Sequence, residues 1–564
     1  MLVSLFLVIG ICYNNLKAMR DKDKIIGCAI LIIAFVLCFT NLPLKPPHSD
    51  EGGNGYFVNQ IWENGFFIYD PNNYHGPLLF YLFQISEKIF GFGIGSFRAV
   101  TALFSVLTIV LILKGRDLLG RYASLFAASA LALSPGITFF GRSAIHEPVF
   151  VFFQILLVMG FLRVREHADR KGIIWSFAGL LGCILLKETF VILVLSLLVA
   201  WGWSEFSPRI SDFFAGEKGK SQNKKAKKKK RGRERRTQAN TGTDKEGTSQ
   251  TLRTGKTESA PKPSWRDLDK SFLLKVVFAC AGIWLALFTG FFHHRQGATD
   301  FFTALTPWLK TGVGGSGHDK PFSYWLSLFG RYEWAAAAGF AGAFIGVAGR
   351  SWKMRFFAAL AIINWLVYSI ISYKTPWCVI TILWPFIIVA GFWIEFIAIS
   401  RRKSPVFWLS LCVAVVIAAQ SAAANVRLNF MHYTDPSEPY VYVQTKNDLK
   451  VVEEIIRKKI RSSPDAQNMR VQINLKDSWP FPWLFSRFPN TGFGDYRKAF
   501  TEKADIIFAE VTHEDKDIEG LYRQRKMDLR DAREPIYVYL KKTYFQGTDL
   551  PGFGQSGMPE GKGR

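Results

Sequence analysis

The chain has 564 residues, of which 49% are hydrophobic and 15% aromatic, and its formal net charge is +25. A soluble protein of this length would form roughly three or four domains, but here the apolar residues gather in long runs that can cross a bilayer as helices. This pattern excludes a wholly soluble protein. It predicts a polytopic α-helical membrane protein with about 11–12 transmembrane helices and a small C-terminal extracytoplasmic α/β domain.

The predicted spans follow one another along two transmembrane modules, residues 1–203 and 271–424. In chain order they are 25–42, 96–113, 122–140, 148–162, 173–186, 189–203, 271–292, 325–348, 356–372, 377–397 and 405–424. The segment 2–13 is apolar but short, so it is either an additional helix or a signal-like end. No small-residue cleavage site follows it, which favours the helix.

Between the two modules, residues 204–270 hold much of the positive charge, centred on the run 224–231. The segment is rich in Ser, Thr, Gly and Gln and has no periodicity, which predicts a disordered insert. This distribution favours a cytoplasmic loop that obeys the positive-inside rule and contacts anionic lipid headgroups. It argues against nucleic acid as a partner, since the charge does not form a folded basic face.

Lysine and arginine in the connections between spans predict the orientation of the chain in a plasma membrane. The basic connections, all on the predicted cytoplasmic side, are 114–121, 163–171, 204–270, 350–355 and 401–403. The connections on the other side are 43–95, 141–147, 187–188, 293–324 and 373–376, together with the C-terminal domain. Most of the unusual polar residues near the membrane therefore face the extracytoplasmic side.

The first extracytoplasmic loop, 43–95, carries Asp50 and Glu51 directly after a strong span. Adjacent carboxylates are costly near hydrocarbon, so they are either solvated or at a helix N-terminus, or they serve as a general base or metal ligand. The later part of the loop, 76–90, is interrupted by polar residues. It predicts an amphipathic helix in the interface rather than a span.

Two short polar connections could contribute to the same site. The connection 141–147 contains Arg142, which can neutralise a phosphate, and His146 and Glu147, which can bind a metal or orient a substrate. The turn at Lys187 splits a long apolar stretch and is explained by a helical hairpin. A buried lysine at this position could also bind a phosphate oxygen.

The later loops add histidine and lysine candidates. His318 lies just before the chain re-enters the membrane, and the other histidines of loop 293–324 have no spacing that fits a closed zinc site. Lys374 and Trp377 lie between two spans, where they suit a pyrophosphate or phospholipid headgroup. Snorkelling of lysine and tryptophan at the interface is the alternative explanation.

Several of these stretches together resemble the GT-C membrane glycosyltransferases. The stretches are Asp50-Glu51, Tyr69-Asp70-Pro71, Tyr74-His75-Gly76-Pro77-Leu78, Arg142 with His146-Glu147, Leu186-Lys187-Glu188-Thr189, His318-Asp319-Lys320-Pro321-Phe322 and Tyr373-Lys374-Thr375-Pro376-Trp377. This class includes the protein O-mannosyltransferases and the aminoarabinose transferase of lipid A. The chain is most similar to the flippase activity-associated protein family linked to archaeal-type N-glycosylation.

The resemblance implies a GT-C-like fold and a glycosyltransferase that moves a sugar from a polyprenyl-phosphate-linked donor to a glycan, lipid or protein acceptor. It assigns catalysis to Asp50 or Glu51, and a divalent metal or further acid–base role to Glu147 and His318. The residues implied to bind substrate or phosphate are His75, Arg142, His146, Lys187, Lys374 and Trp377. The alternative function is a lipid-linked sugar flippase, or an accessory of one, without transferase activity.

The C-terminal domain, predicted at 425–545, alternates strand and helix patterns. Strands are expected at 440–443, 471–475, 506–509 and 536–539, and a helix capped by Asn447 at 448–460. The aromatic stretch 479–483 either stacks on sugar or packs on the membrane domain, and packing is favoured. The Gly-rich tail 546–564 is expected to be flexible.

Overall fold

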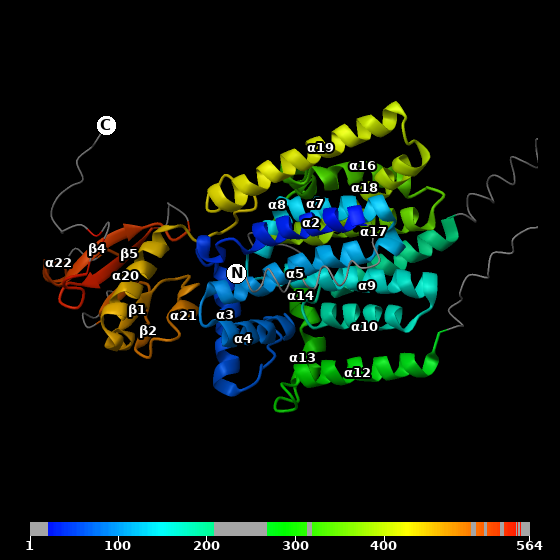
Figure 1. Ribbon diagram of the computed structural model, residues 1–564. Coiled ribbons are helices and arrows are strands. Elements are labelled where there is room, and N and C mark those ends of the chain that lie inside the picture. Colours follow the sequence, from blue (N-terminus) through cyan, green and yellow to red (C-terminus); the bar gives the residue numbers. More distant parts are fainter. Residues whose placement is uncertain are drawn as a thin grey trace, which may run out of the picture.

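The computed structural model describes residues 21–207, 268–312, 318–497, 504–512, 516–530, 535–548, 550 and 553. These residues form a bundle of long, roughly parallel helices and a small sheet domain at one end of it (Figure 1). Two shorter helices lie across that end of the bundle, between its long helices and the sheet domain (Figure 1). The segments 2–13 and 208–267, including most of the basic insert, lie outside the described residues.

The helices before the insert follow the predicted spans closely. They are α2 (Asp21–Phe39), α5 (Ile94–Lys114), α6 (Arg116–Leu119), α7 (Arg121–Leu133), α8 (Pro135–Gly141), α9 (Glu147–His167), α10 (Arg170–Ile184) and a helix at Phe190–Ser207. The predicted span 122–140 is bent by 56° where α7 meets α8. Proline at the first position of α8 fits a helix start, because its missing N–H would have no partner there.

The helices after the insert complete the bundle. They are α12 (Lys270–Phe288), α13 (Gly297–Thr303), α14 (Leu305–Gly312), α15 (Tyr324–Tyr332), α16 (Trp334–Gly346), α17 (Trp352–Ile370), α18 (Val379–Ser400) and α19 (Pro405–Val426), which runs on into a π-helix (Arg427–Met431). The predicted span 325–348 is thus two helices, broken at Glu333. The helix α19 extends past the predicted module boundary at 424.

Within the described residues, eight helices are long and apolar enough to cross a membrane, or nine if the bent pair α7–α8 counts as one span. All eleven predicted spans are helical, but α10, α15 and α16 are each shorter than a full crossing requires. The helices α12 and α19 are the least enclosed of these, because only 6% of the residues in the most apolar stretch of each helix are buried. In a bilayer these two helices face lipid.

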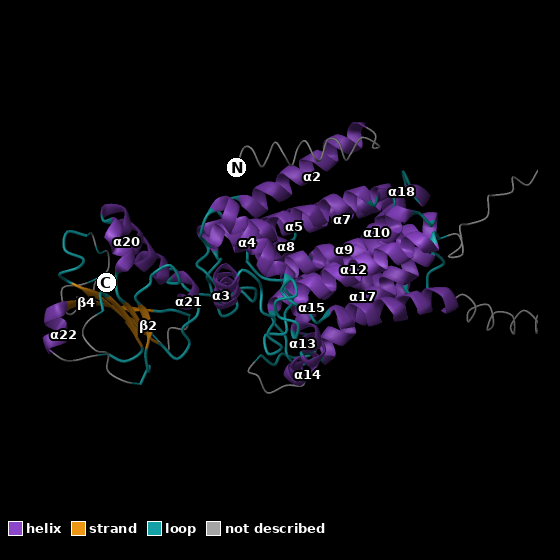
Figure 2. Cartoon of the chain, turned by 90° about the horizontal axis from the view of Figure 1, so that it is seen from below, coloured by secondary structure: helices purple, strands orange, loops and turns teal. Residues whose placement is uncertain are grey.

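The helices α3 (Ser49–Asn64) and α4 (Leu78–Phe90) are the pair that lies across the end of the bundle (Figure 1). The helix α4 is the amphipathic helix predicted at 76–90, and its buried face includes Leu79, Phe80 and Phe83. The helix α3 is polar overall and holds the predicted carboxylate pair in its first turn. Together they form the surface on which the sheet domain rests (Figures 1 and 2).

The sheet domain has five described strands in the order β2-β1-β3-β5-β4. The strand β1 pairs in parallel with β2 and β3, and β5 pairs antiparallel with β3 and β4. Its elements are α20 (Asp448–Ser462), β1 (Val471–Asn474), α21 (Phe481–Leu484), β2 (Thr491–Phe493), β3 (Ile506–Ala509), α22 (Lys516–Leu521), β4 (Tyr522–Met527) and β5 (Ile536–Lys541). The predicted strands at 471, 506 and 536 are confirmed.

Three expectations for this domain are wrong. Residues 440–443 form no strand, and Val443 has a φ of 50°. The Asn447 side chain does not cap α20; it donates instead to the Thr434 hydroxyl at 3.4 Å. Leu550 and Phe553 are buried in the domain core, so the fold continues into the predicted flexible tail. The rest of the tail, 554–564, lies outside the described residues.

Candidate active site

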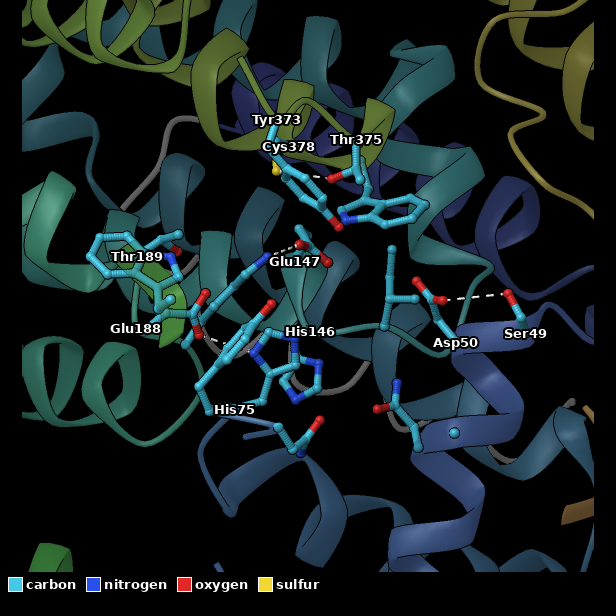
Figure 3. A pocket seen from close by; sticks show the side chains of 18 of the residues that line it. Ser49, Asp50, His75, His146, Glu147, Glu188, Thr189, Tyr373, Thr375 and Cys378 are labelled. Carbon is cyan, nitrogen blue, oxygen red and sulfur yellow. Dashed lines mark hydrogen bonds and ion pairs between the residues drawn. The ribbon is translucent and has the colours of Figure 1, made fainter. Parts of the chain in front are cut away.

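A cavity of about 660 Å³ lies where the bundle, α3 and the sheet domain meet. Its walls come from segments far apart in the chain, and Figure 3 shows their polar side chains converging on one space. The polar and aromatic residues that line it include Ser49, Asp50, Asn54, Asn73, Tyr74, His75, His146, Glu147, Lys187, Glu188, Thr189, Trp308, Trp325, Tyr368, Tyr373, Thr375, Trp377, Asp477 and Trp479.

Asp50 lies in the first turn of α3 and points into the cavity (Figure 3). His48 caps this helix, because its Nδ1 accepts the backbone N–H of Asp50 at 3.0 Å. The Asp50 side chain is 46% exposed, and its contacts are the Ser49 hydroxyl at 3.4 Å and Nδ1 of His48 at 3.7 Å. Among the described residues no lysine or arginine pairs with it, so this carboxylate is open to whatever fills the cavity.

Glu51, the neighbouring carboxylate, is fully buried and does not line the cavity in the described part of the chain. Arg98 of α5 donates to its two oxygens at 2.7 and 2.6 Å, and the backbone N–H groups of His48 and Ala144 donate to them as well. Burial raises the Glu51 pKa, but Arg98 and Lys45 outweigh burial and bring the pKa to about 2.

Glu51 is therefore held away from the cavity with both of its oxygens bonded, and its catalytic role stays a prediction. Glu51 joins three segments of the chain. They are the start of α3, the first turns of α5 through Arg98, and the connection at Ala144 that leads into α9. Asn54, one turn further along α3, adds a second tie by donating to the carbonyl of Ala144 at 2.8 Å. These bonds fix the distance between the Asp50 wall and the wall formed by α9.

The opposite wall of the cavity carries a buried ion pair between Lys187 and Glu147 (Figure 3). Glu147 is the first residue of α9, and Lys187 lies in the turn between α10 and the next helix. Burial lowers the Lys187 pKa, but Glu147 and neighbouring groups outweigh it and hold the pKa well above its usual value. A charged ammonium group therefore lies at this wall at neutral pH.

Two histidines lie beside this ion pair. Nδ1 of His75 is 3.0 Å from the carboxylate of Glu188, and the His75 ring lies 4.4 Å from the ring of His146. Burial, together with the charges of His75 and Lys187, lowers the His146 pKa well below its usual value. The His146 imidazole is therefore neutral at pH 7 and can donate one hydrogen bond without carrying charge.

Two buried nitrogen atoms at the cavity wall lack partners among the described residues. They are Nε2 of His146 and Nδ2 of Asn73. Buried polar atoms nearly always have a hydrogen-bond partner, and leaving one unpaired costs about 1–3 kcal/mol. A ligand whose oxygen atoms reach them from the cavity would supply the missing partners. The unpaired atoms thus indicate a site for an oxygen-rich group.

Aromatic side chains surround the wider part of the cavity. Trp377 lines it and packs edge-on against the ring of His48, with centroids 5.9 Å apart. Tyr373, in the loop that follows α17, also lines the cavity (Figure 3). Trp479 comes from the sheet domain and packs edge-on against Tyr56 of α3. The sheet domain therefore contributes directly to the cavity.

Three predicted phosphate or metal residues do not line the cavity in the described part of the chain. Arg142 donates to backbone carbonyls at and just beyond the C-terminal end of α2, and Lys374 donates to two backbone carbonyls. Nδ1 of His318 is 2.5 Å from the hydroxyl of Tyr442. In the structure each of these side chains joins segments of the chain, and their roles at a donor phosphate or metal stay predictions.

The described residues also fit a metal poorly. No three His, Cys, Asp or Glu side chains come together as a ligand set in the part of the chain that the structure describes. Of the other carboxylates that line the cavity in the described part of the chain, Glu147 is paired with Lys187, Glu188 with His75 and Asp477 with Arg530. Divalent cations need several oxygen ligands, so no step at this site is derived through a metal.

The structure brings Asp50, His75, His146, Glu147, Lys187 and Trp377 together at one cavity, as their common predicted side implied. Sequence reasoning missed Arg98, which lies inside a predicted apolar span, and the cavity residues Asn73 and Asp477. An arginine in a span is itself a signal, since it requires a buried partner. Asn73 and Asp477 carry no comparable signal, because polar residues in loops are common.

A family model described as dolichyl-phosphate-mannose-protein mannosyltransferase matches residues 74–212. No curated protein matches the chain. The match covers the segment from the His75 loop through the Lys187 turn, which supplies much of one cavity wall.

Solved structures of similar fold cover most of the chain. ArnT from Cupriavidus metallidurans bound to undecaprenyl phosphate has a TM-score of 0.54 and 14% identity, over 82% of this chain and 85% of that one. The same protein in the apo state has a TM-score of 0.55 and 13% identity, over 92% and 98%. An Archaeoglobus fulgidus oligosaccharyltransferase tethered with an acceptor peptide has a TM-score of 0.51 and 12% identity, over 84% and 64%.

Proposed function

We propose that this protein, a multi-pass membrane protein of the GT-C fold, transfers a sugar from a polyprenyl-phosphate-linked donor to an extracytoplasmic acceptor. The observation that carries the proposal is the cavity itself. It places an accessible carboxylate, Asp50, across from a charged Lys187 and from the nitrogens of His146 and Asn73 that lack partners among the described residues. The structure of ArnT bound to undecaprenyl phosphate, which shares the fold, supports a donor of this chemical class.

The Lys187 wall suits the donor phosphate. A phosphate diester offers several acceptor oxygens, and charge builds on the phosphate as the sugar departs. Lys187 supplies a positive charge, while His146 and Asn73 supply donors that have no other partner among the described residues. Donors held in a buried cavity stabilise such developing charge much more than the same groups in water.

Asp50 suits the acceptor. In the proposed step its carboxylate takes the proton from an acceptor hydroxyl or amide while the acceptor atom attacks the anomeric carbon. The bond between that carbon and the phosphate oxygen breaks, and the polyprenyl phosphate leaves with the bonding electrons. General bases of this kind contribute about 10²–10⁴ in rate.

The extracytoplasmic location of the site rests on the charge distribution. The ends of the helices opposite the cavity carry Arg116, Arg121, Arg163 and Arg165, all paired with carboxylates. Basic residues concentrate on the cytoplasmic side of membrane proteins. The sheet domain and α3 lie at the other end of the bundle (Figure 1), and both contribute residues to the cavity, so we assign the cavity and the sheet domain to the outer side.

The proposal is tested with the full chain reconstituted in liposomes and a polyprenyl-phosphate-linked sugar. Release of polyprenyl phosphate and transfer of the labelled sugar are measured together. We expect Asp50→Asn to lower kcat/KM by about 10²–10⁴. Glu63→Gln, an exposed carboxylate at the other end of the same helix, is the matched control and should leave the rate unchanged.

Two results would overturn the assignment. One is transfer at the unaltered rate by Asp50→Asn. The other is movement of the intact lipid-linked sugar between leaflets with no sugar transfer, which would favour a flippase or its accessory. Separate labels on the sugar and on the lipid distinguish these outcomes in one experiment.

A further inference from the structure

The sheet domain places one loop at the cavity, between β1 and α21. Asp477 and Trp479 of this loop line the same cavity as Asp50, although they lie more than four hundred residues away in the chain. The Asp477 carboxylate is 57% exposed, and the ring of Trp479 is partly exposed. The proposed function uses neither side chain, and both remain accessible from the cavity.

The position of this loop is fixed by close packing of α21 on α3. A Cβ at Gly52 would lie 2.6 Å from Pro480, and one at Gly55 would lie 2.3 Å from the ring of Trp483. The two glycines are three residues apart, so they lie on one face of α3 and let α21 contact its backbone. Trp483 is buried there and stacks on Phe97 of α5.

The loop is also held from within the sheet domain. Arg530 pairs with the carboxylate of Asp477 and donates to the carbonyl of Trp479. The backbone N–H of Trp479 donates to Asp477 at 3.3 Å. Its ring is edge-on to Tyr56 of α3, with centroids 5.8 Å apart. The carboxylate and the indole are therefore pre-positioned on the cavity side of a rigid loop.

We propose that Asp477 and Trp479 form a subsite that binds a neutral saccharide as the acceptor next to Asp50. An indole face packs against the C–H face of a sugar ring, and a carboxylate accepts hydrogen bonds from adjacent hydroxyl groups. This inference rests on the proposed glycosyl transfer and names its acceptor class. The loop and Asp50 line the same cavity, in which a hydroxyl of the bound saccharide would meet the base.

Charge at this end of the cavity favours a neutral ligand over a phosphorylated one. Among the described residues that line the cavity, Lys187 is the only lysine or arginine, and it is paired with Glu147 on the opposite wall. Asp50, which has no lysine or arginine partner among the described residues, would repel an anionic acceptor placed beside it. Arg530 offers such an acceptor no free positive charge, because its guanidinium is already paired with Asp477.

The test measures binding without donor, so it does not depend on transfer. The full chain in nanodiscs is titrated with maltotriose, mannotriose, cellotriose and chitotriose, and with an uncharged pentapeptide. We expect at least one trisaccharide to bind, and Asp477→Asn and Trp479→Ala each to raise its dissociation constant about tenfold. Trp479→Phe, which keeps a ring, should retain most of the affinity.

Matched controls separate binding from folding. Asp465→Asn changes an exposed carboxylate of the same domain, and Trp408→Ala changes an exposed tryptophan of α19. Neither should alter binding, and all variants should keep the thermal stability of the unaltered protein. The subsite is overturned if no trisaccharide binds, if only the pentapeptide binds, or if affinity is unchanged in both Asp477→Asn and Trp479→Ala.

The two proposals fail in distinguishable ways. Loss of the subsite leaves polyprenyl phosphate release to water unchanged, because Asp50 and the Lys187 wall are intact in the loop variants. Failure of the glycosyl-transfer proposal instead appears as an absence of donor cleavage in the unaltered protein, whatever saccharide it binds.

Discussion

Two neighbouring carboxylates of α3 serve contrasting regions of the molecule. Glu51 belongs to a buried clamp in which every hydrogen bond is made, with Arg98 and two backbone N–H groups as its partners. Asp50 belongs to the cavity wall, where its carboxylate has no cationic lysine or arginine partner among the described residues. Two adjacent residues of one helix thus differ in that the Glu51 carboxylate is fully hydrogen-bonded within the protein, whereas the Asp50 carboxylate is accessible from the cavity.

This difference teaches how the fold protects an open site. A carboxylate without a lysine or arginine partner, and two nitrogens without a partner among the described residues, are held near a membrane only if the surrounding backbone cannot relax to pair them. The clamp supplies that rigidity, since Glu51 fixes both α3 and the connection into α9. Stability and reactivity are therefore assigned to different residues, and they should be separable by mutation.

The largest expected effect is on the clamp. Glu51→Gln removes the charge that pairs with Arg98 in a fully buried environment, and breaking a buried pair in this way costs about 3–5 kcal/mol. We expect that loss in the free energy of unfolding, measured by chemical unfolding in detergent micelles. Asp50→Asn should stay within about 0.5 kcal/mol of the unaltered protein. Equal stability of the two variants would contradict the comparison.

The same pair predicts a pH dependence with a definite sign. The pKa of Glu51 is depressed from 4.5 to about 2 in the folded protein, so its contribution is fully present above its unfolded pKa. The difference in unfolding free energy between the unaltered protein and Glu51→Gln should be level above pH 4.5. It should fall as the pH drops from there toward 2. A difference that grows in this range would show that the folded pKa is raised instead.

The cavity residues and the buried clamp also differ in how much of them could be predicted from the sequence. The cavity residues Asp50, His146 and Lys187 share one predicted side of the membrane, and topology alone brings them to one end of the bundle. The role of Glu51 was not predictable, because its partner Arg98 lies in another helix and the pairing depends on how the two helices pack.

The wrong strand at 440–443 has a related cause. The alternating Tyr-Val pattern is typical of a half-buried strand, but these side chains pack against the bundle instead. The Tyr440 hydroxyl donates to Glu333 at 3.1 Å, and its ring stacks on Tyr332. The alternating pattern therefore belongs to a linker that packs between the two domains. Periodicity alone cannot distinguish such a linker from a strand. The four-residue α21 was equally hidden, because its packing on Gly52 and Gly55 is a tertiary feature.

A smaller effect is expected at the donor wall. His146→Ala removes one of the unpaired donors, and losing a single hydrogen bond to a charged oxygen costs about 1.5–3 kcal/mol, or roughly 10- to 150-fold in kcat/KM. His167→Ala is the matched control, since His167 ends the same helix at the far side of the bundle. Donor cleavage should fall only in the first variant, and an equal fall in both would assign the loss to α9 as a helix.

The smallest expected effect concerns the docking of the sheet domain, and it shows how the cavity keeps its outer wall. Gly55→Ala places a methyl group against the buried ring of Trp483, and such overpacking costs about 1–3 kcal/mol, partly offset by the better helix propensity of alanine. Gly53→Ala is the matched control, because a Cβ there meets nothing within 4 Å and only the helix propensity changes.

Limited proteolysis of the sheet domain and thermal unfolding check this pair. Gly55→Ala should expose the loop that carries Trp479 to proteases, whereas Gly53→Ala should protect it as well as the unaltered protein does. Because the contact of α21 with α3 helps to place the Trp479 loop at the cavity, Gly55→Ala should also weaken saccharide binding while the clamp at Glu51 remains intact. Unchanged proteolysis in Gly55→Ala would mean that other contacts, such as the ion pair of Arg487 with Glu87 of α4, hold the domain in place without the close approach of α21.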